Sequence, residues 1–506
     1  MPAVPPFDVV PPDASAMLMS LRGVGYSLPT AIADIVDNSI AATARNVWID
    51  FRWRGDASSI SILDDGTGMS ASELRLAMKL GGRSPLEKRS ATDLGRFGLG
   101  LKTASLSQCR RFTVASRKDG MMSLRRWDLD YILQHANDWC LLGAPSSGSE
   151  DLFVPINRLA SGTLVVWETL DRIAGSNTND EITTEDAFLE AIDQTAQHLA
   201  MVFHRYLDGN SPPLRIFING TTNRHRVRSW DPFLTDHAAT IRKPMEPIPT
   251  AAGTIEVQGF ILPHKDRMDA SQYERAAGPD GWTSQQGFYV YRNNRLLVVG
   301  SWLGLGGTRG WTKEEAHKLA RIRLDMPNTA DEDWKIDIKK STARPPARIR
   351  ARLRALAEDT RETARRVFAH RGNYGPRAAT PDLVRAWTSI ERRDAVTYRI
   401  DRTHPAIRQV LEKAGALTDD IDAMLRIIEA TVPVQKIWLD TVEKGQLQQE
   451  PFVTEPPEHL AGVLSVLYRD LLSRVGLGPV EARARLSRTE PFHAWPSLIE
   501  ALPDNP

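Results

Sequence analysis

The sequence predicts an α+β protein: an α/β sandwich, then a second α+β module, then a mainly helical C-terminal region. Short alternating apolar runs are interspersed with segments of helical periodicity through about residue 345, which predicts mixed strands and helices. After residue 382 the periodicity is mainly helical. The 506 residues, 42% of them hydrophobic and 25% charged, suffice for about three globular domains.

Composition and charge exclude several classes of protein. The formal net charge is +1, so a polyanionic partner would need a local basic surface. Cys109 and Cys140 are too few for a disulfide framework or a self-contained zinc site, and they suit a reducing cytosol. We find neither a signal-peptide pattern nor an apolar run long enough to span a bilayer. We therefore expect a cytoplasmic protein without membrane contact.

The first motif is a predicted helix that carries Asp34 and Asn38. Ser27 suits the N-cap and Pro29 the first turn, and apolar residues recur along one side. Because Asp34 and Asn38 are four residues apart, a carboxylate and an amide project from one face, whereas Asp37 lies off that face. Such a pair is usually a solvated surface, so this motif alone is weak.

The second motif follows a short apolar run, residues 60–63, that predicts a strand. It is Asp64-Asp-Gly66-Thr-Gly68-Met69, which places a carboxylate at the end of the strand and allows a ligand to approach the backbone. The predicted helix of residues 70–80 then begins with a capping box, Ser70 to Glu73.

The third motif is rich in glycine and precedes a predicted helix. Its glycines free backbone N–H groups at a helix N-terminus, where phosphates bind. The residues concerned are Gly95, Gly98, Leu99, Gly100, Leu101 and Lys102. The polar segment 81–93 before it is typical of a lid. Further strands are predicted at 112–116, 122–129 and 163–168, the last beginning with Thr163.

In this order and spacing, the motifs resemble the ATP-binding domain of the GHKL superfamily, which includes gyrase, the heat-shock chaperone, histidine kinases and MutL. The resemblance implies a Bergerat-type α/β sandwich and the cofactors ATP and Mg²⁺. It implies that Asn38 coordinates Mg²⁺, that Asp64 accepts the adenine amino proton, partly through water with Thr163, and that Lys102 binds phosphates. The implied nucleotide-binding residues are Asn38, Asp64, Gly66, Gly68, Met69, Gly95, Gly98, Leu99, Gly100, Leu101, Lys102 and Thr163.

The chain departs from the superfamily pattern at the general base. Hydrolytic members carry Glu four residues before the metal-binding Asn, and this chain has Asp34. Aspartate has the same charge but one methylene fewer, so we expect Asp34 to activate water with altered geometry and ATP hydrolysis to be slow.

A second module is predicted between residues 176 and 345. A helix is expected over 185–207, a hairpin turns at Asn293-Asn294, and another helix is expected over Lys313–Ile322. The module resembles the ribosomal-S5-like transducer of MutL, type II topoisomerases and MORC proteins. That resemblance makes Lys339 or Lys340 the lysine that reaches the γ-phosphate; the alternative is a basic strand edge facing water.

We therefore expect an ATP-binding domain at 1–175, a transducer at 176–345, a basic helix at 346–371 and a mainly helical domain at 382–506. Arg350, Arg354, Arg361 and Arg365 are predicted to share one face of the basic helix, either for DNA or only for solubility.

Within the superfamily, the motifs most resemble prokaryotic MORC-like ATPases. That resemblance implies an ATP-dependent homodimer acting on double-stranded DNA without sequence specificity, often in phage defence with Z1-type helicases or nucleases. The alternatives are a MutL-like repair factor, although we see no nuclease metal cluster in the sequence, and a chaperone of the heat-shock type. A histidine kinase is disfavoured, because its ATPase domain normally ends the chain.

Overall fold

The computed structural model describes residues 12–23, 25–81, 100–135, 138–172, 185–209, 213–307, 310–330, 334, 343–369, 384–392, 395–433 and 458–504. The chain divides into two compact units, Met1–Tyr374 and Gly375–Pro506. The larger unit contains two extensive hydrophobic cores, one for each of its sheets, and the smaller unit has a core of its own. The predicted α+β class is confirmed.

The first sheet has six strands in the order β4-β3-β5-β2-β1-β6. Their bounds are β1 Asn46–Arg52, β2 Ser59–Asp64, β3 Arg111–Lys118, β4 Met121–Asp128, β5 Gly162–Glu168 and β6 Arg215–Ile218. Neighbouring strands are antiparallel except β1 and β6, which are parallel. Since β6 lies beyond residue 175, the sheet crosses the boundary that we expected for the first domain. In the register, Asp64 pairs with Thr163.

Helices cover one face of this sheet. They are α1 Ala14–Arg22, α2 Leu28–Ala41, α3 Ala71–Met78, α4 Gly100–Gln108, α5 Leu129–Gln134, α6 Glu185–Val202 and α7 His204–Leu207. The apolar stripe of α2 is buried together with inward-facing residues of β1 and β2, such as Ile49 and Ile62. On the other face, the 3₁₀ segment η1 (Glu150–Arg158) buries Phe153 and Ile156.

Local capping signals account for several helix ends. The predicted capping box of α3 is present, because Ser70 Oγ accepts a hydrogen bond from Glu73 N and Glu73 Oε2 accepts one from Ser70 N. Ser27 occupies the N-cap of α2, although its side chain does not cap the helix. The single helix expected over 185–207 is interrupted at Phe203, which separates α6 from α7.

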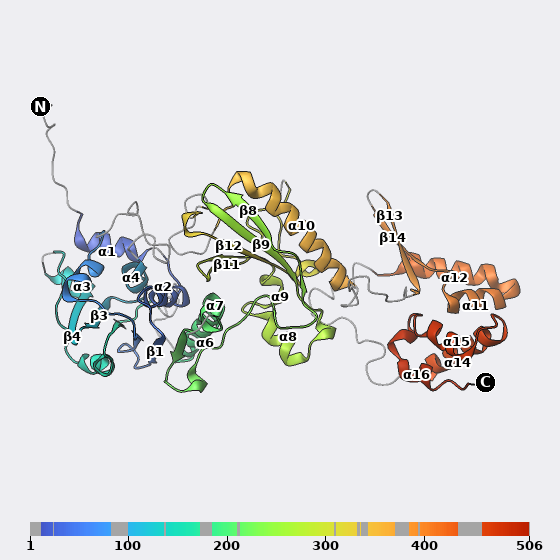
Figure 1. Ribbon diagram of the computed structural model, residues 1–506, viewed down its shortest axis with the longest axis horizontal. Helices are drawn as coiled ribbons and strands as arrows, with labels where there is room; N and C mark the ends of the chain where they lie inside the picture. Colours follow the sequence, from blue (N-terminus) through green and yellow to red (C-terminus); the bar gives the residue numbers. More distant parts are fainter. Residues whose placement is uncertain are drawn as a thin grey trace, which may run out of the picture. The chain divides into compact units, whose positions relative to one another are not determined.

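The second sheet has the order β11-β10-β12-β9-β7, with β8 also paired to β9. Its strands are β7 Ile241–Arg242, β8 Glu246–Thr250, β9 Gly253–Ile261, β10 Gly287–Arg292, β11 Arg295–Ser301 and β12 Ala320–Met326. The long helix α10 (Ala347–Ala369) lies across β9 and β12 (Figure 1). A side chain at Gly259 would meet Thr360 Oγ1 at 2.5 Å, so this glycine allows the close approach of α10. The short helices α8 (Ala270–Ala277) and α9 (Gly281–Ser284) complete the module.

The prediction of a helix over Lys313–Ile322 is wrong. Only Glu315–His317 form a 3₁₀ turn, and the chain then enters β12. Ile322 and Leu324 of β12 are buried under α10, and β12 pairs with β10 and β9 on its two sides. The tertiary pairing of β12 therefore overrides the local helical propensity.

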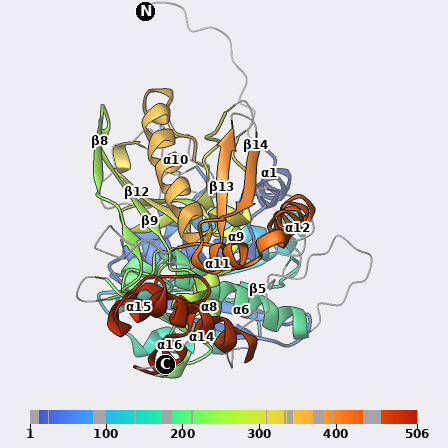
Figure 2. The same cartoon turned by 90° about the vertical axis from the view of Figure 1, so that its right-hand side faces the viewer.

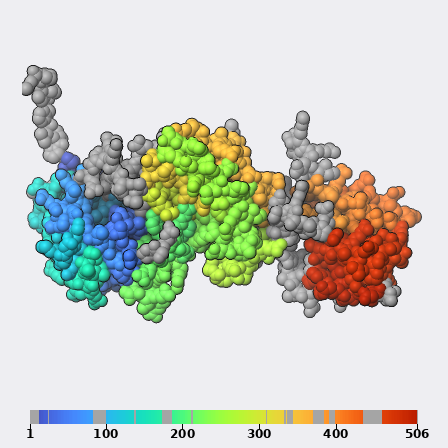
Figure 3. Space-filling model, viewed as in Figure 1, coloured from blue at the N-terminus to red at the C-terminus, as the bar shows by residue number. Residues whose placement is uncertain are grey.

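The smaller unit is mainly helical, as predicted. Its strands β13 (Trp387–Arg392) and β14 (Ala395–Ile400) form an antiparallel hairpin (Figure 2). Its helices are α11 Pro405–Lys413, α12 Thr418–Thr431, α14 Glu458–Ser473, α15 Pro479–Leu486 and α16 Pro496–Glu500. The last three helices share a core around Leu464 and Tyr468 and form one continuous body (red in Figure 3). Among the described residues, no helix combines the length and apolar character needed to cross a membrane.

Candidate nucleotide-binding site

Helix α2 brings Asp34 and Asn38 to one face, as predicted. Asp34 is only 4% exposed, and its Oδ2 accepts a hydrogen bond from the Tyr26 hydroxyl at 3.0 Å. The Asn38 side chain is exposed, and its Nδ2 donates to the backbone oxygen of Asp34 at 3.0 Å. This bond turns the amide nitrogen toward the helix and leaves the amide oxygen as an acceptor for a cation.

Asp64 lies at the end of β2, where three elements donate to its carboxylate. Oδ2 accepts from Ser39 Oγ at 2.9 Å, and Oδ1 accepts from the N–H groups of Gly66 at 2.9 Å and Thr163 at 3.2 Å. Burial raises the pKa of the Asp64 carboxyl above its ordinary value of 3.8, while these hydrogen bonds oppose the rise. The residue is therefore a buried acceptor fixed between α2 and β5.

Ser116 is a residue of this site that the sequence analysis missed. Its hydroxyl lies 2.9 Å from Thr163 Oγ1, donates to the Gly162 backbone oxygen at 3.1 Å and accepts from Met69 N at 2.8 Å. It thereby links the Asp-x-Gly-x-Gly motif to β5. Only the register of β3 against β5, which pairs Ser116 with Thr163, brings it there.

Two glycines of the site permit close backbone approaches. At Gly68, with φ 67°, an added Cβ would lie 2.0 Å from the backbone oxygen of Arg117. At Gly162, with φ 151°, an added Cβ would lie 2.1 Å from the backbone oxygen of Asp64. The predicted Gly66 is also crowded, by Ala42 at 2.8 Å. Any side chain at these positions would displace the strand ends that hold Asp64.

The glycine-rich third motif is described only from Gly100 onward. Gly100 and Leu101 begin α4, and a Cβ on Gly100 would lie 3.5 Å from Asp34 Oδ2, so the start of α4 faces the α2 carboxylate. Gly95, Gly98 and Leu99 lie outside the described residues, as do Lys339 and Lys340. Their predicted roles stay predictions.

The ammonium group of Lys102 lies at the end of α3. The residue is buried, and its Nζ donates to the backbone oxygens of Ala77 at 2.9 Å and Lys79 at 3.0 Å. The ammonium group thus satisfies carbonyl groups at the C-terminal end of α3. Phosphate binding by Lys102 stays a prediction.

Asp37, which lies off the Asp34 and Asn38 face, contacts the second sheet. Its Oδ1 lies 3.3 Å from Nε of Arg295, and both side chains are buried. Asp37 therefore forms a buried ion pair with the first residue of β11. The local sequence carries no signal for this pairing, because 258 positions separate the two residues.

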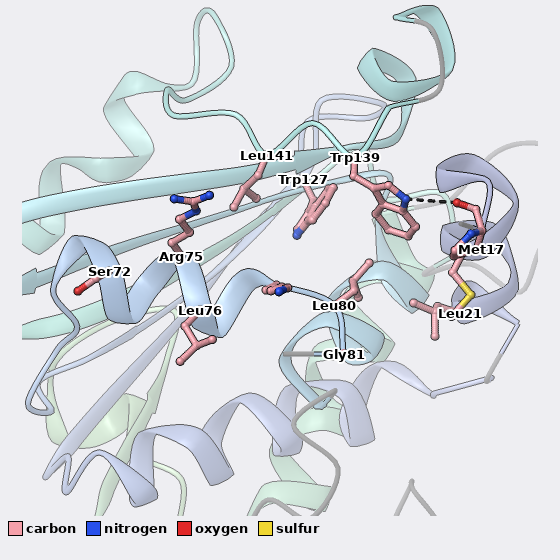
Figure 4. Close-up of a pocket in the computed structure, with 12 residues that line it drawn as sticks. Met17, Leu21, Ser72, Arg75, Leu76, Leu80, Gly81, Trp127, Trp139 and Leu141 are labelled. Atoms are coloured by element: carbon pink, nitrogen blue, oxygen red, sulfur yellow. Dashed lines mark hydrogen bonds between the residues drawn. The ribbon is translucent and has the colours of Figure 1, made fainter. Parts of the chain in front are cut away.

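A cavity of about 970 Å³ lies between α1, α3 and the end of β4 (Figure 4). It is mostly apolar, with Met17, Leu76, Trp127 and Trp139 in its wall. Trp139 Nε1 donates to the backbone oxygen of Pro12 at its rim. None of the described residues predicted to bind the nucleotide is among the residues that line this cavity.

Residues 26–163 match the profile of the family described as histidine kinase-, DNA gyrase B- and HSP90-like ATPase, and this range contains the whole constellation from Tyr26 to Thr163. The chain carries a GHKL ATPase domain. This confirms the resemblance inferred from the three motifs, and ATP is the nucleotide that such a domain binds.

The chain is also similar to ATPases of the MORC group. It is 32% identical to ATPase morc-1 of Caenorhabditis elegans over 94 residues, which are 19% of this chain and 11% of the relative. It is 23% identical to ATPase MORC2B of Mus musculus over 186 residues, 36% of this chain and 18% of the relative. It is 23% identical to ATPase MORC2 of Homo sapiens over 193 residues, which are 37% of this chain and 18% of the relative. The aligned segments thus cover less than a fifth of these relatives.

Proposed function

We propose that this chain binds ATP with Mg²⁺ in its GHKL domain, hydrolyses it slowly, and uses ATP to control dimerisation on DNA. The observation that carries the proposal is the fixed carboxylate of Asp64, within the range that matches the ATPase family and beside the α2 face of Asp34 and Asn38.

Adenine recognition by Asp64 fits its hydrogen bonds. A carboxylate can accept about four hydrogen bonds, and Ser39, Gly66 and Thr163 account for three. The remaining acceptor capacity suits the exocyclic amino group of adenine. Guanine presents a carbonyl oxygen at the equivalent position, so the site favours ATP over GTP.

Asn38 suits a magnesium site that has few protein ligands. Its amide oxygen is exposed on the α2 face, and Mg²⁺ commonly combines one or two protein oxygens with phosphate oxygens and water. When bound, Mg²⁺ would offset negative charge on the phosphates. The first N–H groups of α4, at Gly100 and Leu101, supply further phosphate contacts.

Asp34 is the proposed general base. Its carboxylate faces the start of α4, where the phosphates would bind, and Tyr26 orients one of its oxygens. A carboxylate oxygen has two lone pairs, so Oδ2, which faces the start of α4, can also accept a proton from water. The proposed contact of Lys339 or Lys340 with the γ-phosphate would make the second module sensitive to ATP rather than ADP.

DNA binding is proposed for the surface that begins at Lys339 and continues along α10. The structure corrects one member of this surface: Arg361 is only 9% exposed, and its guanidinium lies 4.7 Å and 4.6 Å from the ring centroids of Trp302 and Trp311. Arg350, Arg354 and Arg365 are exposed. They can contact phosphates without reading base sequence.

By its resemblance to prokaryotic MORC-like ATPases, we propose that the chain acts in phage defence or DNA processing, with a Z1-type helicase or a nuclease as partner. The rivals are a MutL-like repair factor and a chaperone. In the described part of the chain no group of acidic, histidine or cysteine side chains could hold a nuclease metal. A chaperone would bind unfolded clients in an ATP-dependent manner and would leave DNA unbound.

The deciding experiment measures the rate of ATP hydrolysis, and separately the molecular mass by light scattering. Both are measured with and without double-stranded DNA. We expect Mg²⁺-dependent hydrolysis that changes with DNA, dimers with a non-hydrolysable ATP analogue, and monomers with ADP. Asn38→Ala should abolish Mg·ATP binding and dimerisation together. A monomer saturated with analogue would contradict ATP-gated dimerisation, and unchanged behaviour with DNA would favour the chaperone.

A further inference from the structure

A buried ion pair joins the GHKL domain to the second sheet. Nε of Arg295 lies 3.3 Å from Oδ1 of Asp37, and the two side chains are 5% and 3% exposed. Two buried charges are costly unless they remain paired. The pair therefore favours one position of β11, which begins at Arg295, relative to α2, which carries Asp37.

The turn between β10 and β11 and the neighbouring side chains fix the position of Arg295. Asn293 and Asn294 form the turn between β10 and β11 with φ of 48° and 64°, the left-handed geometry of a tight hairpin. Nη1 of Arg295 donates to the backbone oxygen of Leu296 at 2.6 Å, and its guanidinium lies 5.6 Å from the Phe203 ring centroid. The guanidinium is thus presented to α2 in a defined orientation.

The corner between α6 and α7 supports the same turn. The Tyr206 hydroxyl donates to the backbone oxygen of Asn293. Burial, together with the nearby Asp37 carboxylate, raises the pKa of Tyr206 to about 12, so the hydroxyl stays protonated and remains a donor at neutral pH. The corner packs between α2 and the hairpin through Phe203, in the core shared with α2.

Asp37 is adjacent to Asn38 and one helical turn after Asp34. Because α2 is a continuous helix, a shift at Asp37 also moves the exposed amide and the buried carboxylate. We propose that Arg295 is a positioning residue: through Asp37 it holds α2 in the orientation in which Asn38 and Asp34 engage Mg·ATP. This inference rests on the proposed function and adds a residue from outside the ATPase domain to its nucleotide site.

An ion pair that only stabilised the fold would have a different effect on nucleotide binding. Asp64 is also held by Gly66 and Thr163, which do not belong to α2, so adenine binding should survive a shift of α2. The gain in affinity that Mg²⁺ provides should be lost when α2 shifts, because it depends on Asn38. The ratio of nucleotide affinities with Mg²⁺ and with EDTA therefore separates positioning from stability, since a lower folded fraction alone leaves this ratio unchanged.

The test compares the unaltered full chain with Arg295→Gln, Arg295→Lys and the control Arg205→Gln. Arg205 pairs with Asp325 at 2.5 Å in the same corner and stacks on Tyr291 at 3.5 Å, so its loss removes a neighbouring ion pair that does not involve α2. The probe is ADP, titrated with Mg²⁺ and with EDTA, alongside single-turnover ATP hydrolysis.

We expect Arg295→Gln to reduce the Mg²⁺-dependent gain in affinity and the hydrolysis rate by about tenfold or more, because small displacements of catalytic groups are costly. Affinity in EDTA should change by less than about twofold, and Arg205→Gln should keep the ratio of the unaltered chain. Arg295→Lys keeps the charge and should recover part of the loss, which keeps the test valid if Arg295→Gln folds poorly.

The double variant Asp37→Asn/Arg295→Gln should lose less of the Mg²⁺-dependent affinity than the sum of the losses in the two single variants. Two amides can form a hydrogen bond with each other, whereas each single variant leaves one buried charge without its partner. A folded Arg295→Gln or Arg295→Lys with the Mg²⁺ ratio and rate of the unaltered chain would overturn the positioning role while leaving ATP hydrolysis intact. Failure of the unaltered chain to bind nucleotide would overturn the proposed function, and the positioning role with it.

Discussion

The Tyr26 hydroxyl lies 3.0 Å from Asp34 Oδ2, and both side chains are buried. Tyr26 precedes α2, so the hydrogen bond joins the segment before the helix to its second turn. Aspartate is one methylene shorter than the glutamate expected at this position. The Tyr26 hydroxyl fixes Oδ2, the oxygen that faces the start of α4, which gives the short side chain a defined direction toward the phosphates.

The first prediction tests that relationship. Tyr26→Phe should slow ATP hydrolysis by about tenfold while leaving nucleotide affinity unchanged, because only the orientation of the base is lost. Asp34→Asn should slow hydrolysis by about 10² to 10⁴, the usual contribution of a general base. Single-turnover hydrolysis and equilibrium binding measure the two effects. Hydrolysis by Asp34→Asn at the unaltered rate would remove Asp34 from the mechanism.

The second prediction concerns the choice of adenine over guanine by Asp64. Asp64→Asn should weaken ATP binding by about 1–3 kcal/mol, roughly 5- to 150-fold, because a buried acceptor is lost. GTP binding should change little. Asp65→Asn is a matched control, since Asp65 accepts from the backbone N–H groups of Arg45 and Asn46 at 2.8 Å. Equal losses for ATP and GTP would show that Asp64 does not recognise adenine.

The third prediction is a pH dependence of stability. Burial raises the pKa of Asp64 in the folded state above 3.8, so between 3.8 and the raised value the folded chain binds more protons than the unfolded chain. Stability from this group is therefore complete below about pH 4 and is lost as pH rises through the folded pKa. Urea unfolding across pH 4 to 8 should show this loss in the unaltered chain, and the difference from Asp64→Asn should follow it. A difference that does not vary with pH would contradict the raised pKa.

The fourth prediction separates the arginines of α10. Arg350, Arg354 and Arg365 are exposed, so changing all three to Gln should weaken duplex DNA binding and reduce the slope of log affinity against log salt by about 3. Arg361→Gln should instead destabilise the fold by about 1–3 kcal/mol, because the guanidinium stacks on two indoles. Salt-dependent binding and urea unfolding measure both. Unchanged affinity and slope in the triple variant would assign these arginines to solubility.

The sequence by itself determined the features that depend on neighbouring residues. The capping box of α3, the turn at Asn293-Asn294 and the shared face of Asp34 and Asn38 follow from short-range spacing. The Asp-x-Gly-x-Gly motif likewise placed Asp64 at the end of a strand. These patterns sufficed to identify the GHKL domain, because its motifs are local in sequence.

Only the tertiary structure decided which distant residues meet. Residues 313–322 have local helical propensity, but pairing with β10 and β9 makes the chain a strand from Ala320. Lys102 donates to backbone oxygens at the end of α3, Arg361 lies against the rings of Trp302 and Trp311, and Arg295 reaches Asp37. Each of these side chains could equally have faced solvent or phosphate by its local sequence. Their partners are set by packing across the chain, where the cost of burying an unpaired charge selects the arrangement.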